Sequence, residues 1–155
     1  MQFPNWLALL PVAGATALIL AGPEAALNRI VFSNRAVVFV GLSSELEGEE
    51  MRGVNSPGFL GGDRTSLDLP EPQETLVKAA IATGKPVVVV LTSGSAVAVN
   101  SAAAGASAVL AAWYGGEEAG TAIAETLAGA NNPAGRLPVT FYRGVDQLPP
   151  FTDYA

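Results

Sequence analysis

The chain of 155 residues contains neither histidine nor cysteine. The absence of cysteine excludes disulfides, cysteine-ligated zinc and thiol chemistry. Because histidine is missing too, few ligand types remain for a transition metal, and we expect neither a metal nor another cofactor. Any proton transfer has to rest mainly on carboxyl groups, with lysine and tyrosine as weaker candidates.

Charge is also scarce. Only 14% of the residues are charged, and 8 Lys and Arg stand against 14 Asp and Glu, which gives a net charge of −6. The basic residues are scattered along the chain, which argues against a nucleic-acid partner. Hydrophobic residues make up 50% of the chain. This is too apolar for a disordered protein and enough for the core of one domain.

Residues 6–22 form an apolar run that could be mistaken for a signal peptide or a membrane span. No Lys or Arg precedes the run, and Pro11 and Gly14 interrupt it. It is also shorter than the roughly 20 residues that a spanning helix needs. We predict a turn around residues 11–14, a buried strand at 15–20, and no membrane partner. The localisation stays open, since a cytoplasmic, periplasmic or secreted parent protein fits equally well.

Strand and helix patterns alternate along the rest of the chain and predict an α/β layer fold with a mainly parallel sheet. Continuous apolar runs are typical of buried strands, and apolar stripes at helical spacing predict helices. Glu74 can pair with Lys78 one turn later. The predicted strands are 36–42, 86–91, 108–113 and 137–141, and the predicted helices are 71–83 and 117–127, with one possible helical turn at 102–105.

An acidic loop follows the strand at 36–42, with four glutamates within six residues: Glu45, Glu47, Glu49 and Glu50. The carboxyl ends of strands are where α/β folds usually bind their ligands, so this loop is a candidate site. A solvated surface loop is the alternative, because charged residues are mostly exposed. Residues 43–70 look irregular throughout, and a loop of such length inside a domain is usually functional.

Six sequence blocks occur in the order, and with nearly the spacing, of one known family. They resemble the C-terminal α/β sandwich domain of glycoside hydrolase family 3, which includes β-glucosidases and β-xylosidases. The resemblance implies a three-layer sandwich with a mainly parallel sheet. The blocks are Val37–Glu50 (VVFVGLSSELEGEE), Gly62–Pro70 (GDRTSLDLP), Gly84–Gly94 (GKPVVVVLTSG), Ala112–Gly120 (AWYGGEEAG), Asn132–Phe141 (NPAGRLPVTF) and Leu148–Tyr154 (LPPFTDY).

The resemblance implies a single domain over residues 1–155, in which 36–154 match well and 1–30 loosely match an initial turn and first strand. Family members have several dozen residues between that strand and the next, whereas only Ala26–Arg35 intervene here. Nothing resembles the family's N-terminal (β/α)8 barrel, which carries the nucleophilic aspartate. We therefore expect an incomplete sandwich, a trimmed domain or gene fragment that is inactive alone and can self-associate.

The family's motif assigns the general acid/base to the acidic loop. By resemblance, Glu49 is the first choice and Glu47 the second, while Glu45 and Glu50 are expected to be solvated. Asp63 and Arg64 would clamp the loop to the sandwich, since Arg can contact a carboxylate through two bonds. A surface pair of little energetic value is the alternative.

The adjacent Trp113 and Tyr114 could stack on a sugar, although packing is more typical of aromatic residues at the end of a buried strand.

The resemblance thus implies the C-terminal module of a β-glycosidase, a hydrolase of terminal β-linked glucose or xylose units. Its substrate would be a β-glucoside or β-xyloside, and its partner the (β/α)8 barrel of the same enzyme. One alternative is a non-catalytic α/β module that binds carbohydrate or a partner domain. A nucleotide-binding domain is a weaker alternative, because no G-x-G-x-x-G opens a helix.

Overall fold

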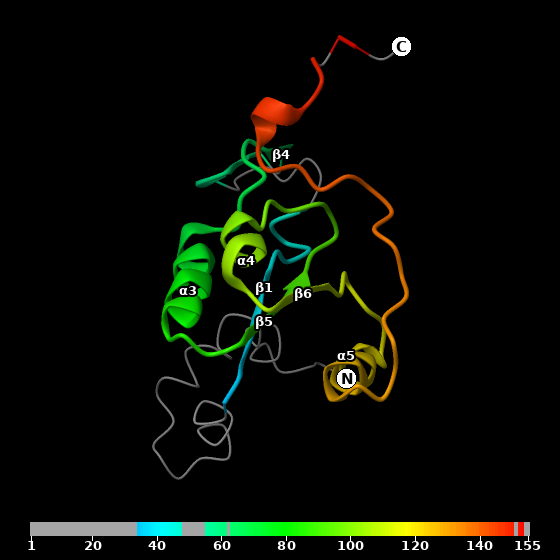
Figure 1. The fold of residues 1–155 in the computed structure, drawn as a ribbon. Helices are drawn as coiled ribbons and strands as arrows, with labels where there is room; N and C mark the ends of the chain where they lie inside the picture. Colours follow the sequence, from blue (N-terminus) through cyan, green and yellow to red (C-terminus); the bar gives the residue numbers. More distant parts are fainter. Residues whose placement is uncertain (1–33, 48–54, 62, 151, 154–155) are drawn as a thin grey trace. The chain divides into compact units, whose positions relative to one another are not determined.

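The computed structural model describes residues 34–47, 55–61, 63–150 and 152–153 (Figure 1). These residues divide between two compact units. The first unit comprises the described parts of Met1–Gly41, Leu69–Leu91 and Asn100–Leu110, and the second comprises those of Leu42–Asp68, Thr92–Val99 and Ala111–Ala155. The predicted strand at 15–20 and the apolar run at 6–22 lie outside the described residues. No helix in the described ranges has the length and apolar character that a membrane span requires.

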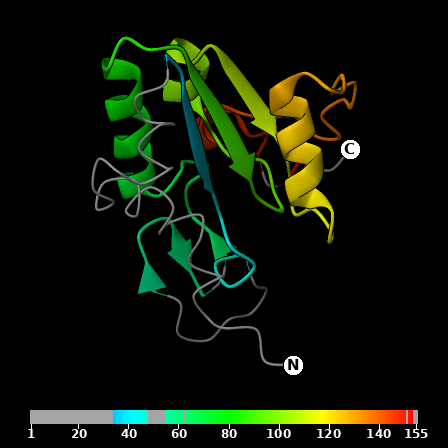
Figure 2. The ribbon, with the colours of Figure 1, turned by 90° about the horizontal axis from the view of Figure 1, so that it is seen from below.

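A three-stranded sheet forms the centre of the first unit, in the order β1 (Ala36–Gly41), β5 (Val87–Thr92), β6 (Ala108–Ala111). The Ala36 N–H donates to the Pro86 carbonyl at 2.9 Å, and the Leu42 N–H donates to the Thr92 carbonyl at the same distance. From the first bond to the second, the residue number rises in both strands, so β1 and β5 are parallel. Figure 2 shows the three strands side by side and running in one direction. The predicted α/β fold with a mainly parallel sheet is confirmed.

The core of this unit lies around β5. Val87, Val89, Val90 and Leu91 are each at most 1% exposed, as expected for a central strand covered on both faces. Val40 of β1 and Val77 of α3 (Glu71–Ala82) are buried with them. A continuous apolar run therefore identified the central strand correctly, within one residue at each end.

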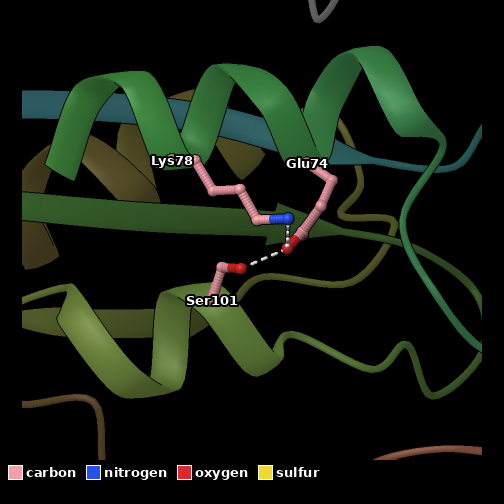
Figure 3. A network of polar contacts seen from close by, with 3 residues as sticks. All are labelled: Glu74, Lys78 and Ser101. Carbon is pink, nitrogen blue, oxygen red and sulfur yellow. Dashed lines mark hydrogen bonds and ion pairs between the residues drawn. The ribbon is translucent and has the colours of Figure 1, made fainter. Parts of the chain in front are cut away.

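Helix α3 follows its predicted bounds closely. Pro72 occupies its first turn, and the chain leaves the helix at Gly84, whose φ is +71° and whose N–H donates to the Ile81 carbonyl at 3.0 Å. The predicted ion pair between Glu74 and Lys78 is confirmed, with 3.5 Å between Oε1 and Nζ. Figure 3 shows that Ser101 of α4 (Asn100–Gly105) also donates to Glu74, so one carboxylate joins the two helices.

A side chain of α3 marks the point where the chain leaves β1. Gln73 accepts a hydrogen bond from the Gly41 N–H at 2.7 Å and donates one to the Gly41 carbonyl at 2.8 Å. The amide group thus satisfies both backbone groups of Gly41, as a neighbouring strand would. The last residue of β1 is fixed immediately before the acidic loop begins.

The second unit contains a small antiparallel meander and one longer helix. The meander consists of β2 (Asn55–Ser56), β3 (Phe59–Leu60) and β4 (Asp63–Arg64), with Ser56 opposite Phe59 and Phe59 opposite Arg64. Segment 43–70 was predicted to be irregular, and this meander corrects that prediction. The helix is α5 (Ala119–Ala128), and a 3-10 turn, η1, spans Val145–Gln147.

Two further predictions need correction in this unit. The helix begins at Ala119 and not at Glu117, because the Ala119 N–H first closes a turn onto the Gly116 carbonyl at 3.1 Å. The predicted strand at 137–141 is wrong, since these residues are irregular in the structure. Leu137 and Val139 are 54% and 52% exposed. Their alternating pattern favours a strand, but a strand also needs a neighbour to bond with.

Candidate functional site

The base of the acidic loop is a tight turn directly after β1. The N–H groups of Leu46 and Glu47 both donate to the Ser43 carbonyl, at 2.9 and 3.0 Å. This turn directs the Glu47 side chain toward the segment that follows β5. We call residues 43–47 the loop base.

The Glu47 carboxylate is the most heavily bonded side chain of the loop base. It accepts a hydrogen bond from the Gly94 N–H at 2.7 Å, and it also accepts one from the Ser95 hydroxyl and one from the Tyr114 hydroxyl. Two oxygens therefore receive three donors from two separate segments of the second unit. Charge-assisted hydrogen bonds of this type are among the stronger ones in proteins.

The absence of a side chain at Gly94 is a condition of this arrangement. A Cβ at this position would stand 2.9 Å from Cε2 of Tyr114 and 3.1 Å from Oε2 of Glu47. Both distances are shorter than ordinary van der Waals contact. Any larger residue would force the tyrosine ring or the carboxylate to shift, so the absence of a side chain at Gly94 lets both lie close to its backbone.

Tyr114 reaches Glu47 through an unusual backbone turn. The preceding residue, Trp113, has φ +55°, a left-handed conformation that bulky side chains rarely adopt. Its indole ring packs edge-on against Phe141, with 6.0 Å between ring centroids and an interplanar angle of 83°. Trp113 is therefore a packing residue in this structure, and Tyr114, which is 46% exposed, contacts a carboxylate.

The electrostatics of the cluster follow from these contacts. Burial by itself would raise the pKa of Glu47. The hydrogen bonds from Ser95, Tyr114 and Gly94, together with the positive charge of Arg64, outweigh burial and hold this pKa below its usual value. Burial, and then the bond to Glu47 and its charge, raise the pKa of the Tyr114 phenol. At neutral pH Glu47 is therefore an ionised acceptor and Tyr114 a protonated donor.

Arg64 organises the adjacent backbone. Its guanidinium donates to the carbonyls of Ser66 at 3.1 Å and Ala96 at 2.8 Å, and to the Ser95 hydroxyl at 3.2 Å. Burial lowers the pKa of Arg64, while the charges of Glu47 and Asp68 raise it and offset part of that shift. Arg64 thus links β4 to the Glu47 partner Ser95.

Asp63 lies exposed on β4, and within the described residues it forms no ion pair with Arg64. Arg64 instead joins the neighbouring segments by donating to backbone carbonyls and to one hydroxyl. A clamp made by the two residues together stays a prediction.

The predicted acid/base candidates have different places in the structure. Glu49, the first choice, lies outside the described residues, as does Glu50. Glu47, the second choice, lies in the cluster just described, and Glu45 is exposed. The sequence analysis missed Gly94 and Ser95. The signal that could have found them is the turn Thr92–Ser95 at the carboxyl end of β5, the strand next to β1.

No group of three or more potential ligand side chains gathers into a metal site among the residues that the structure describes. The chemistry available here is that of carboxylates with hydroxyl and backbone donors.

Comparison with known proteins agrees with this architecture. The family model described as "Glycosyl hydrolase family 3 C-terminal domain" matches residues 10–155. The chain belongs to this family. The predicted recognition is confirmed, and with it the assignment to a family of glycoside hydrolases.

Relatives of this family 3 domain carry the names of both enzyme types that the resemblance implied, β-xylosidase and β-glucosidase. Over 122 residues it is 48% identical to a xylan 1,4-β-xylosidase of Xylanibacter ruminicola, which covers 79% of this chain and 14% of the relative. It is 44% identical over 86 residues to a periplasmic β-glucosidase of Salmonella typhimurium, which covers 56% of this chain and 11% of the relative.

Solved structures give the same result. A β-glucosidase from Listeria innocua in complex with gluconolactone superposes with a TM-score of 0.66 at 30% identity, covering 89% of this chain and 16% of that one. A β-glucosidase from Erythrobacter marinus superposes with a TM-score of 0.65 at 32% identity, covering 96% and 18%. The family 3 domain thus spans less than a fifth of the length of these relatives.

Proposed function

We propose that this domain is the C-terminal module of a β-glycosidase that hydrolyses terminal β-linked glucose or xylose units. In this proposal the acidic loop supplies the general acid/base, and a (β/α)8 barrel of the same enzyme supplies the nucleophile. Family membership supports the enzyme class, and relatives named β-xylosidase and β-glucosidase support the two sugars. The observation that carries the proposal is the fixed loop base at the carboxyl end of β1, which leads directly into the remaining glutamates.

The chemistry requires one carboxyl group that can hold and release a proton. In a retaining glycosidase a nucleophilic carboxylate attacks the anomeric carbon, and a carboxylic acid about 5–5.5 Å away protonates the leaving oxygen. The same group then removes a proton from the water that releases the sugar. Such an acid needs a pKa near or above its usual value.

Glu47 does not suit that requirement, because its donors favour the ionised form and lower its pKa. Glu49 follows two residues later on the same loop, and we propose it as the acid/base. Glu47 remains the second candidate, since a bound substrate or a partner domain could displace its donors.

The test compares Glu49→Gln with Glu47→Gln in a complete enzyme that carries this domain. Glu49→Gln should lower turnover of substrates with poor leaving groups by about 10²–10⁴-fold, the usual contribution of general acid catalysis. For substrates with good leaving groups, the rate of the glycosylation step should fall far less, because these leaving groups need little protonation. Glu45→Gln, in the same loop base and exposed, is the matched control. Intact turnover in Glu49→Gln with loss in Glu47→Gln would transfer the role to Glu47.

The chain by itself should have no glycosidase activity, because the reaction needs a nucleophile on the opposite face of the sugar, rigidly held. The exposed apolar side chains of the second unit, including Leu137, Val139 and Leu148, favour association instead. Aryl β-glucoside and β-xyloside assays of residues 1–155, with size-exclusion chromatography alongside, test both expectations. A monodisperse monomer with turnover that depends on Glu49 would contradict them.

The same exposed side chains favour the second candidate function, a non-catalytic interaction or carbohydrate-binding module. Intact turnover of the complete enzyme in Glu49→Gln and in Glu47→Gln would support it.

A further inference from the structure

The strained turn at Trp113 has a consequence for the loop base. A left-handed backbone at a bulky residue is unfavourable and persists only where the surrounding structure imposes it. Here the indole is held edge-on by Phe141, and the next residue, Tyr114, extends to the Glu47 carboxylate. The strain therefore coincides with a specific contact made by the neighbouring side chain.

The space around this contact is equally specific. The tyrosine ring passes so close to Gly94 that a methyl group there would lie 2.9 Å from it, and the same methyl would lie 3.1 Å from the Glu47 carboxylate. Glu47 is held at once by the Gly94 N–H and the two hydroxyls. A flexible surface glutamate would need none of these features. The arrangement fixes the place of one carboxylate at the base of a loop.

We propose that Tyr114 is a positioning residue, which fixes the loop base through its hydrogen bond to Glu47 and thereby sets where the loop presents its acid/base carboxyl group. The inference rests on the proposed function, because positioning matters to catalysis only if Glu49 on this loop transfers the proton. Tyr114 does not contact the reacting atoms in this proposal. Its effect passes through Glu47, which precedes Glu49 by two residues.

The first experiment tests the anchor without reference to activity. Hydrogen exchange of the loop base, residues 43–47, is followed by mass spectrometry in the 155-residue chain and in its Tyr114→Phe variant. Loss of the phenol hydroxyl should speed exchange in this segment severalfold, and Tyr142→Phe, which removes another phenol hydroxyl from the second unit, should leave it unchanged. Equal exchange in Tyr114→Phe and the original chain would overturn the proposal.

The second experiment tests the consequence in the complete enzyme. Tyr114→Phe should lower kcat for a poor-leaving-group substrate by about 10- to 100-fold, the effect of displacing a catalytic group by about an ångström. KM and the glycosylation rate of a good-leaving-group substrate should change little. Gly94→Ala should have the same pattern, and Tyr142→Phe none. An equal loss for both substrate types, or a change in KM alone, would mark Tyr114 as merely structural.

A double variant separates this inference from the proposed function. If Tyr114 acts through Glu47, Tyr114→Phe combined with Glu47→Gln should be no slower than Glu47→Gln alone, whereas independent effects would multiply. Effects that multiply would overturn the proposal.

If Glu49→Gln and Glu47→Gln both leave turnover intact, the proposed function fails and the catalytic part of the inference with it. The exchange experiment still decides whether Tyr114 anchors the loop base.

Discussion

The two units of the molecule are stabilised in different ways. In the first unit the side chains of β5 are almost completely buried, and helix and sheet share one apolar core. In the second unit no residue between 111 and 150 is buried, and helix α5 has no buried side chain. The buried apolar side chains of this unit, such as Phe59 and Val97, lie before residue 111. Single polar side chains, above all Arg64 and Glu47, also join its segments.

This difference separates stability from function. An apolar core tolerates many similar side chains, provided that volume and pattern are kept. A carboxylate that receives three donors depends on each partner, because each lost donor removes a hydrogen bond that stabilises its ionised form. We therefore expect a charge placed in the core of the first unit to unfold the chain, and conservative substitutions around Glu47 to change the loop while the fold survives.

The largest expected effect comes from placing a charge in the first core. Val89 is completely buried in β5, and Val89→Asp would leave an unpaired carboxylate there or force its protonation. We expect a loss of about 4 kcal/mol or more in the free energy of unfolding, enough to abolish a cooperative transition in urea. Val139→Asp, at a position that is 52% exposed, should change stability by less than about 0.5 kcal/mol. Similar losses in both variants would contradict the contrast between the units.

The next effect concerns Arg64, the polar centre of the second unit. Arg64→Met keeps much of the side-chain volume but leaves the Ala96 and Ser66 carbonyls without their donor. We expect a loss of about 2–3 kcal/mol, the cost of part-buried groups left unsatisfied. Arg64→Lys should recover part of it, since one ammonium cannot serve all these acceptors. Urea denaturation measures the loss, and Arg136→Met, at an exposed arginine, is the control. An unchanged midpoint in Arg64→Met would mean that water replaces these bonds.

Elements with local sequence signals could be predicted, whereas contacts between distant parts of the chain could not. Strand β5 and helix α3 were found almost to the residue, because their periods and end signals are local. The strand expected at 137–141 failed, because a strand depends on a partner that local pattern does not reveal. The contact between Glu47 and Gly94 joins positions 47 residues apart, and no spacing rule brings them together.

Arg64 illustrates the same limit within the site. The sequence predicted that Asp63 and Arg64 together clamp the loop, and that clamp stays a prediction. The bonds from Arg64 to residues 95 and 96 were not predicted. That Arg64 donates several hydrogen bonds could be predicted from the chemistry of its guanidinium. Its partners depend on tertiary structure.

A smaller effect, with a distinctive pH dependence, is expected for Glu47. Its pKa in the folded state is lowered below the ordinary value of 4.5, so its ionised form stabilises the fold above that pH. The stabilisation is lost as pH falls below 4.5 through the folded-state pKa. Glu47→Gln should therefore lose about 1–2 kcal/mol at neutral pH, a value kept low because the group is only partly buried and solvent screens it, and approach the original chain in acid. Urea denaturation at several pH values measures the difference. A gap that stays constant from pH 7 to pH 3 would contradict this assignment, and Glu45→Gln, at an exposed position, serves as the control.

The smallest expected effect returns to the first unit, where a polar contact adds to an apolar core. Lys78 pairs with Glu74 one turn away, its side chain is 64% exposed, and Glu74 has a second partner in Ser101 (Figure 3). Lys78→Gln keeps the helix propensity and removes the ion pair alone, so we expect a loss of about 0.3–0.5 kcal/mol. The loss should vanish in 1 M NaCl, where the screening length falls to about 3 Å. Glu74→Gln should cost more, because it also weakens the bond from Ser101 that joins α3 to α4. Equal losses in the two variants, or a Lys78→Gln loss that survives high salt, would show that packing of the lysine stem is responsible and not its charge.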